Sequence, residues 1–189
     1  MPNIYGHPGE SIQEMNRDRF SELHKIDKRY HAILKQIHDW DVWIEWEIVV
    51  ARILEDLAIK DSRYSVIHDV RFDGGNIDHI VVFDNRIVII VETKASSYLF
   101  DERKVVKQVT WQWDFLKKRL WIKYIKSFVC LSRSDKKFHE TKEGIEVTDL
   151  TSLEAEIRSC ITNQVQYHNN EHPENKELIK DLIKMKGYH

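Results

Sequence analysis

The most constraining feature of the chain is a strand-like segment, residues 87–94, which reads IVIIVETK. Its first five residues are all apolar, the pattern of a strand with both faces buried. Such a strand lies inside a sheet and needs helices on both sides. The segment nevertheless ends in Glu92, Thr93 and Lys94, and the β-rich segment 78–83 before it begins with Asp78. The chain must therefore combine an apolar hairpin with charged groups at one end.

The loop between these two segments decides whether the charged groups meet. Residues two apart on a strand point to the same face, so the carboxylate and the ammonium of the ETK tripeptide share one face. A two-residue turn would place Asp78 on the opposite face from Glu92. A three-residue loop over 84–86 pairs Phe83 with Ile87 and sets the two acids opposite each other. We therefore predict an odd-length loop, or a β-bulge that restores this register.

Buried charges of this kind destabilise a fold unless they pair or bind a ligand. A structural ion pair between Glu92 and Lys94 is one interpretation, but it leaves Asp78 without a partner. It also leaves Glu47 without a partner, and this acid lies in the apolar run WEIVV. A divalent cation would satisfy all four groups, because Mg²⁺ prefers carboxylate, water and phosphate oxygens. Asp78 and Glu92 would hold Mg²⁺, with Mn²⁺ as a substitute, and Lys94 would orient a water for attack on phosphorus.

Capping boxes, hydrophobic periods and turn residues divide the whole chain into helices and strands. This order predicts an α/β fold in which helices flank a mixed sheet. We expect helices over 11–38 and 41–58, strands over 64–70, 78–83 and 87–94, a helix over 102–120, strands over 126–132 and 144–150, a helix over 151–161, and a last helix between Pro173 and Gly187.

The composition of the 189-residue chain excludes some classes of protein. With 32% charged residues and no apolar run near the ~20 residues of a spanning helix, we expect no membrane protein. The polar N-terminus carries no secretory signal, and the two cysteines form no disulfide framework, so we expect a cytoplasmic protein. The net charge is −2, but residues 101–137 hold 11 Lys/Arg against 4 Asp/Glu, a net of +7. That segment is either a solvated helix face or a surface for a polyanion.

The spacing of Asp78 and the ETK tripeptide resembles the PD-(D/E)xK nuclease signature. The sequences around them, NIDHIVVF and RIVIIVETKA, resemble the core of the nuclease-related domain (NERD) family. Upstream, EIVVARIL resembles the Glu-x-x-Val-Ala-x-x-Leu helix of that family, and downstream Gln108 lies on a segment similar to its glutamine helix. The resemblance covers roughly residues 41–155, with Trp46 where the family usually has glycine.

The resemblance implies a restriction-endonuclease-like fold, an αβββαβ core with extra N- and C-terminal helices. It implies an N-terminal helical extension (1–39), a nuclease-like core domain (40–163) and a C-terminal helical tail (164–189). It further implies catalytic roles for Glu47, Asp78, Glu92, Lys94 and Gln108, and metal coordination by Asp78, Glu92 and the Thr93 carbonyl.

The favoured hypothesis is a Mg²⁺-dependent nuclease, with DNA favoured over RNA by analogy with the superfamily. The alternative is a nucleic-acid-binding or assembly module on a nuclease-like fold that does not cleave. The apolar face of the N-terminal helix suits a homodimer or another partner. His79 points away from Asp78 on its strand, and a supporting or structural role is favoured over substrate contact. The candidate contacts to nucleic acid are Lys104, Lys107, Lys117 and Lys118 for phosphates and Trp111 for a base.

Overall fold

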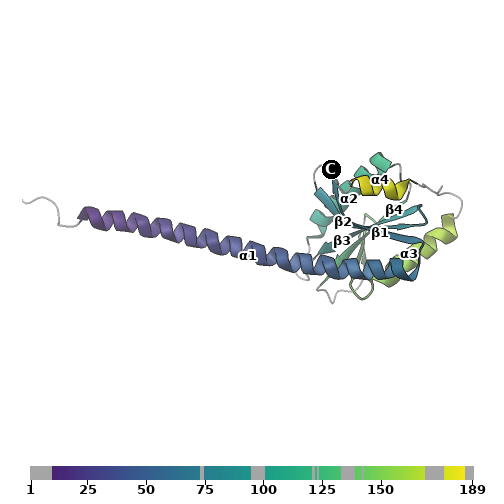
Figure 1. The fold of residues 1–189 in the computed structure, drawn as a ribbon, viewed down its shortest axis with the longest axis horizontal. Helices are drawn as coiled ribbons and strands as arrows, with labels where there is room; N and C mark the ends of the chain where they lie inside the picture. Colours follow the sequence, from purple (N-terminus) through teal and green to yellow (C-terminus); the bar gives the residue numbers. More distant parts are fainter. Residues whose placement is uncertain are drawn as a thin grey trace, which may run out of the picture. The chain divides into compact units, whose positions relative to one another are not determined.

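The computed structural model describes residues 10–72, 75–94, 101–120, 122, 124–132, 139–141, 143–168 and 177–185. The chain divides into two compact units, Met1–Val42, here the N-terminal unit, and Trp43–His189, the core unit. The elements drawn in Figure 1 are α1 (Glu10–Lys60), β1 (Tyr64–Phe72), β2 (Gly75–Phe83), β3 (Ile87–Lys94), α2 (Glu102–Leu120), β4 (Ile125–Leu131), β5 (His139–Glu140), β6 (Glu146–Asp149), α3 (Leu153–His168) and α4 (Leu178–Met185).

The core unit is built on a mixed six-stranded sheet with the strand order β1-β2-β3-β4-β6-β5. The strands β1, β2 and β3 pair antiparallel, whereas β4 pairs parallel with both β3 and β6. The short β5 lies at the edge, antiparallel to β6. The predicted α/β fold, with an αβββαβ core, a mixed sheet and additional helices, is confirmed.

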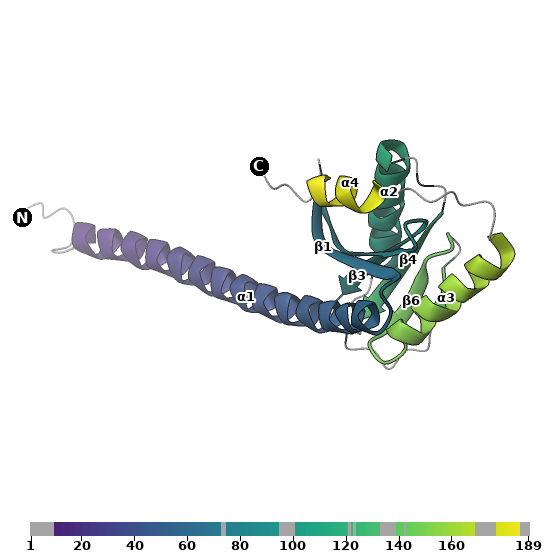
Figure 2. The ribbon, with the colours of Figure 1, turned by 45° about the vertical axis from the view of Figure 1, so that its right-hand side comes forward.

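Helices cover both faces of the sheet, as the apolar β3 requires (Figures 1 and 2). One face, here the α1 face, packs against α1 and α3 and includes Val81 and Val91. The other, the α2 face, packs against α2 and α4 and includes Ile80 and Ile90. Every residue of β3 except its last, Lys94, is buried. Its run of apolar residues therefore reflects a strand that is shielded from water on both sides.

The hairpin between β2 and β3 has the predicted register, with Phe83 paired to Ile87. Arg86 N donates to Phe83 O at 3.0 Å, which closes a tight turn. The turn residues Asp84 and Asn85 have φ of 50° and 54°, a left-handed backbone that Asp and Asn tolerate better than most residues. Arg86 is then the one unpaired residue before the ladder resumes, as in a β-bulge. A tight turn plus one extra residue thus restores the odd-length register.

The N-terminal part of the chain differs from the expectation of two helices, over 11–38 and 41–58. The helix α1 continues without a break across this point. No glycine or proline occurs between the two predicted helices, so nothing in the backbone stops the hydrogen-bond ladder.

The C-terminal helices also have different bounds from those predicted. The helix α3 ends at His168 rather than near residue 161, so the predicted core–tail boundary at 163/164 falls within it. The helix α4 begins at Leu178, and Pro173, the predicted start of the last helix, lies outside the described residues. Leu178 and Leu182 of α4 pack in the core of the α2 face. The division into three parts stays a prediction.

The N-terminal unit leaves an apolar stripe of α1 exposed. Its members recur at steps of three and four residues along the helix, so they lie on one side of it. Among the described residues, no helix combines the length and apolar character needed to cross a membrane. The stripe consists of Phe20, Leu23, Ile26, Tyr30, Ile33, Leu34 and Ile37, which are between 43% and 72% exposed.

Candidate functional site

The two predicted acids of the hairpin come together at one end of the sheet. Asp78 lies near the start of β2 and Glu92 near the end of β3, and these strands run antiparallel. The ladder pair nearest this end of the sheet is His79 with Val91, and the same register places Asp78 opposite Glu92. At the next position the hydrogen bond between the strands is made by a side chain and not by two backbone groups. Thr93 N donates to Asp78 Oδ2 at 2.8 Å. The loop length therefore decides the meeting of the two acids, as predicted.

Glu92 is the centre of a group of hydrogen bonds on the α2 face. Only 1% of the residue is exposed. Lys94 Nζ lies 2.6 Å and Gln108 Nε2 2.5 Å from its Oε1 atom. Lys94 Nζ also lies 3.4 Å from Gln108 Oε1. Three predicted site residues thus form one group, and the Glu92–Lys94 ion pair weighed as a structural interpretation is part of it.

Gln112, one helical turn beyond Gln108, belongs to the same group but was not predicted. Its Nε2 donates to Glu92 Oε2 at 3.0 Å and lies 3.1 Å from the carbonyl oxygen of Asn76. The residue is fully buried, and within the described residues its Oε1 atom has no hydrogen-bond partner. The signal that would have found it is the four-residue step from Gln108, which places both amides on one side of α2.

Negative charge dominates the electrostatics of the site. Burial, and then the neighbouring Glu92, raise the pKa of Asp78 to about 8, against the lowering effect of the Thr93 amide and Lys94. Burial also raises the pKa of Glu47 on α1, with further contributions from Glu92 and Asp69. Lys94 lowers the pKa of both Asp78 and Glu47, but burial and the neighbouring acids outweigh its effect.

Asp69 of β1 is an acid that no sequence pattern singled out. Its φ of 52° is left-handed, and the β1–β2 ladder pairs the residues on either side but skips Asp69 itself. Its carboxylate accepts from Arg71 Nη2 at 3.1 Å and from Asn76 Nδ2 at 3.4 Å. Asp69 is close enough to raise the pKa of Glu47. The left-handed backbone at Asp69 therefore adds a fourth acid to the group of Asp78, Glu92 and Glu47.

The donor atoms at the site are chemically suited to a hard divalent cation. Asp78 and Glu92 supply carboxylate oxygens, the ligands that Mg²⁺ and Mn²⁺ prefer. The raised pKa of Asp78 reflects burial and repulsion from Glu92, and a positive charge beside both acids would offset each effect. As the side chains stand, no cluster of three or more His, Cys, Asp or Glu residues is arranged for a metal within the described ranges. Glu92 instead accepts hydrogen bonds from neighbouring side chains.

The residues predicted to contact nucleic acid all lie on α2. At 3.6 residues per turn, Lys104, Lys107, Trp111 and Lys118 fall on one exposed side of the helix, beside Gln108. This side is here called the basic face of α2. Lys117 points to a different side, where its Nζ lies 5.4 Å from the ring centre of Trp113. Trp111 is 45% exposed and contacts Phe72 with its ring. Four of the five predicted residues thus form one surface.

On the α1 face, His79 lies on the opposite side of β2 from Asp78, as its place in the strand predicts. Its Nδ1 lies 2.8 Å from Nδ1 of His68 and its Nε2 lies 3.3 Å from Thr93 Oγ1. His68 was not singled out from the sequence, because the pairing of β1 with β2 brings it beside His79. The hydrogen bonds of His79 therefore go to His68 and Thr93, and not to Asp78 or Glu92.

Comparison with known proteins identifies the segment that carries this site. Residues 42–132 match the family model of the nuclease-related domain, NERD. No curated protein and no solved structure matched the chain. The matched segment includes the end of α1 with Glu47, the three antiparallel strands with Asp78 and Glu92, and the α2 helix with Gln108. The part of the chain that builds this site, residues 42–132, is therefore similar to the nuclease-related domain family.

Proposed function

We propose that the core unit is a metal-dependent nuclease, a hydrolase that cleaves phosphodiester bonds of nucleic acid, with DNA as the expected substrate. One observation carries the proposal: buried Glu92 accepts hydrogen bonds from Lys94 and Gln108 at the end of the sheet where Asp78 lies. The match to a nuclease-related family supports it. We place the activity in the cytoplasm, where the free cysteines Cys130 and Cys160 would stay reduced.

The proposed cofactor is Mg²⁺, with Mn²⁺ as a substitute. Asp78, Glu92 and the Thr93 carbonyl would hold it. When bound, such a cation polarises a phosphoryl oxygen and lowers the pKa of a nearby water. Glu47 and Asp69, which add negative charge around the two main acids, would strengthen the attraction for a cation.

The remaining side chains of the site would position water and stabilise charge. The Lys94 side chain is 29% exposed, so its ammonium reaches from Glu92 to solvent. It would donate to the attacking water and stabilise the negative charge that develops on the phosphate. Gln108 contacts both Glu92 and Lys94, and would hold the ammonium in place. Glu47, from the helix side, would orient the water as a hydrogen-bond acceptor.

The basic face of α2 is the proposed contact surface for nucleic acid. Its three lysines would neutralise backbone phosphates, and this kind of binding does not depend on base sequence. Trp111 is exposed enough to stack on a base. Lys117, on another side of the helix, would contact only a substrate that wraps further around α2. Because Gln108 borders this surface, a bound backbone would lie next to Lys94.

The second candidate function is a nucleic-acid-binding or assembly module that does not cleave. The direct ion pair between Glu92 and Lys94 favours this second function, because the two charges already neutralise each other without a metal. The exposed stripe of the N-terminal unit also favours an assembly role. We propose that the stripe mediates homodimerisation, since a long helix gains most of its stability by packing an apolar face.

Cleavage of DNA separates the two candidate functions. Linear and circular DNA are incubated with the full chain in Mg²⁺, Mn²⁺ or EDTA, alongside Asp78→Ala, Lys94→Ala and the surface control Lys180→Ala. A nuclease cleaves in both metals, stops in EDTA, and loses activity in the first two variants only. Binding of DNA without cleavage would support the module. Cleavage that both site variants retain would assign the activity to a contaminant.

Light scattering tests the proposed homodimer. Ile33→Glu places a charge in the stripe, whereas Ala32→Glu places one on the opposite side of the same helix. The wild type and Ala32→Glu should have the mass of a dimer, and Ile33→Glu that of a monomer. A monomeric wild type would exclude self-association through the stripe.

A further inference from the structure

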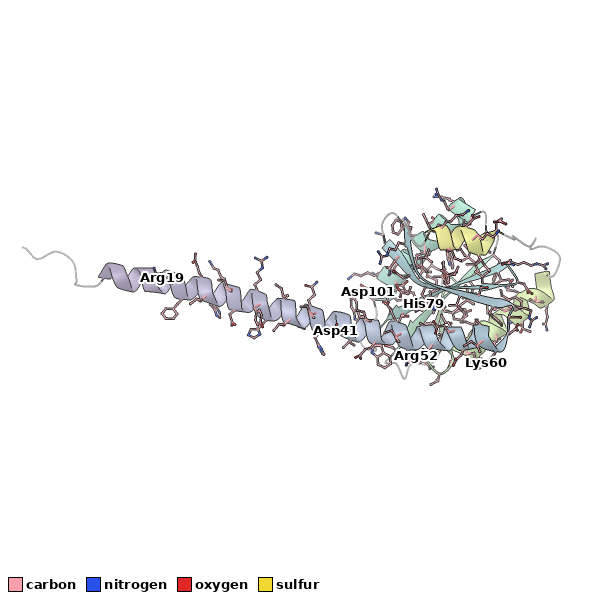
Figure 3. All side chains as sticks on the ribbon, viewed as in Figure 1. Arg19, Asp41, Arg52, Lys60, His79 and Asp101 are labelled. Carbon is pink, nitrogen blue, oxygen red and sulfur yellow. The ribbon has the colours of Figure 1, made fainter. Side chains whose placement is uncertain are left out.

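Four side chains from four elements form a continuous polar chain across the α1 face. Glu55 Oε1 on α1 lies 3.3 Å from His68 Nε2 on β1. His68 Nδ1 lies 2.8 Å from His79 Nδ1 on β2, and His79 Nε2 lies 3.3 Å from Thr93 Oγ1 on β3. Figure 3 labels His79 within the core unit. This set of residues is here called the histidine chain.

The histidine chain runs from the surface into the interior of the sheet. The Glu55 side chain is 55% exposed and that of His68 28%, whereas His79 is only 3% exposed. An imidazole at this depth is destabilising unless its nitrogens are hydrogen-bonded, and each nitrogen of both rings has a partner within reach. The neighbours of His79 on the same face, Val81 and Val91, show that an apolar side chain would fill such a position. Packing alone therefore does not explain two histidines here.

With both rings neutral, only one arrangement of hydrogens satisfies the histidine chain. The carboxylate of Glu55 accepts, so His68 carries its hydrogen on Nε2 and accepts at Nδ1. His79 then carries its hydrogen on Nδ1 and accepts at Nε2 from the Thr93 hydroxyl. Burial, and then repulsion from His68 when that ring is protonated, lower the pKa of His79 to about 3, in agreement with a neutral His79 ring. Each hydrogen bond of the histidine chain is therefore donated in the same direction, from Thr93 through His79 and His68 to Glu55.

Thr93 connects the histidine chain to the candidate site. Its hydroxyl contacts His79 on the α1 face, while its backbone N–H donates to Asp78 Oδ2. The adjacent residues Glu92 and Lys94 point to the α2 face, where they pair with each other. The Thr93 residue is thus held through its side chain and its amide at once. Any rotation of this residue would move the Asp78 carboxylate and the peptide groups beside Glu92.

We propose that His68 and His79 are positioning residues, which orient Thr93 and, through it, the Asp78 carboxylate and the Thr93 carbonyl for a divalent cation. This inference rests on the proposed metal-dependent function. Side chains that hydrogen-bond to metal ligands typically change metal affinity by about 10- to 100-fold when they are replaced. The expected role is therefore measurable in metal binding, apart from any cleavage.

The first test needs no metal. In the full chain, ¹⁵N NMR of the histidine rings should find hydrogen on Nε2 of His68 and on Nδ1 of His79. In His79→Leu, exchange of the Thr93 amide should speed up at least about tenfold relative to other β3 amides, because the hydroxyl loses its acceptor. His79→Gln, whose amide both donates and accepts, should restore slow exchange. The control Val81→Ala, on the same strand and face, should leave the Thr93 amide no faster than its neighbours.

The second test measures Mn²⁺ affinity by calorimetry on the same variants and on His68→Leu, which replaces a less buried ring. Both leucine variants should bind Mn²⁺ about tenfold more weakly than the wild type, and His79→Gln should bind within a few fold of it. Wild-type affinity in both leucine variants, an equal loss in Val81→Ala, or hydrogen on Nε2 of His79 would each overturn the inference. A wild type that neither binds Mn²⁺ nor cleaves DNA would instead overturn the proposed function, and the Thr93 exchange rates would still decide the positioning role.

Discussion

The two faces of β2 and β3 both carry polar groups at the same end of the sheet, but they differ in charge. On the α2 face the acids Asp78 and Glu92 have Lys94 as their cation, and the pKa of Asp78 is raised to about 8. On the α1 face His79 is neutral and each of its ring nitrogens has a partner inside the protein. A neutral group whose hydrogen bonds are all made inside the protein needs no ligand for its stability. The acidic group gains stability when positive charge is added, which is the property of a site for a cation.

The largest expected effect tests whether catalysis belongs to the α2 face alone. Lys94→Met removes the ammonium but keeps a long side chain beside Glu92. We expect kcat for DNA cleavage to fall by about 100-fold or more, because the developing charge on phosphate loses its donor. Val81→Ala, on the α1 face, should lower the melting temperature while kcat changes little. Cleavage assays and thermal melts of both variants check this. Equal losses of kcat in the two variants would show that general destabilisation, not chemistry, explains the effect.

The next effect concerns stability, and its sign follows from the raised pKa of Asp78. In the folded protein Asp78 keeps its proton up to about pH 8, whereas in the unfolded chain the carboxyl has its ordinary pKa of 3.8. Between these values the folded state binds more protons, so stability falls as the pH rises. Without metal, we expect the melting temperature to fall between pH 5 and 8, by on the order of 5 °C. Melts of the wild type and Asp78→Asn measure this slope.

Asp78→Asn should lose most of that slope, because its side chain does not titrate. Mg²⁺ should raise the melting temperature of the wild type more at pH 8 than at pH 5, since the cation competes with the proton. His79→Gln, on the neutral α1 face, should keep the pH slope of the wild type. A slope that is unchanged in Asp78→Asn would place the titrating group elsewhere, and the contrast between the two faces would then be wrong.

Only those features of the two faces that depend on local sequence patterns could be predicted from the sequence. The apolar run of β3 predicts a central strand, and the length of its loop to β2 predicts that Asp78 and Glu92 meet. Both features depend on residues close together in the chain. Gln108 was predicted from a resemblance, not from spacing.

The missed residues depend on contacts between elements that are distant in the sequence. His68 reaches His79 only through the register of β1 with β2. Asp69 enters the site through a left-handed backbone inside a strand, which is rare for any residue other than glycine. Gln112 looks like an ordinary polar residue of an amphipathic helix until Asn76 and Glu92 are placed beside it. Tertiary structure, not propensity, assigns these three residues to the site.

A smaller effect is expected from the glutamine that the sequence did not reveal. Gln112→Leu removes the donor to Glu92 Oε2 and leaves that buried oxygen without this partner. We expect the free energy of unfolding to fall by about 1–3 kcal/mol, the typical cost of an unsatisfied buried group. Gln108→Leu, which is less buried, should cost less stability. Urea unfolding of both variants checks the order. A larger stability loss in Gln108→Leu would mean that the partly exposed amide, not the buried one, supports Glu92.

The smallest effect separates the two sides of α2 in binding. Lys118 lies on the basic face of α2, while Lys117 lies over Trp113. If the basic face follows a phosphate backbone, Lys118→Ala removes one phosphate contact and lowers the slope of log affinity against log salt by about 1. Lys117→Ala removes the same charge from the molecule but should leave the slope nearly unchanged. Fluorescence anisotropy with a labelled duplex at several salt concentrations measures both slopes. Equal slopes in the two variants would show that net charge attracts DNA, and the basic face would then have no special part in placing the backbone beside Lys94.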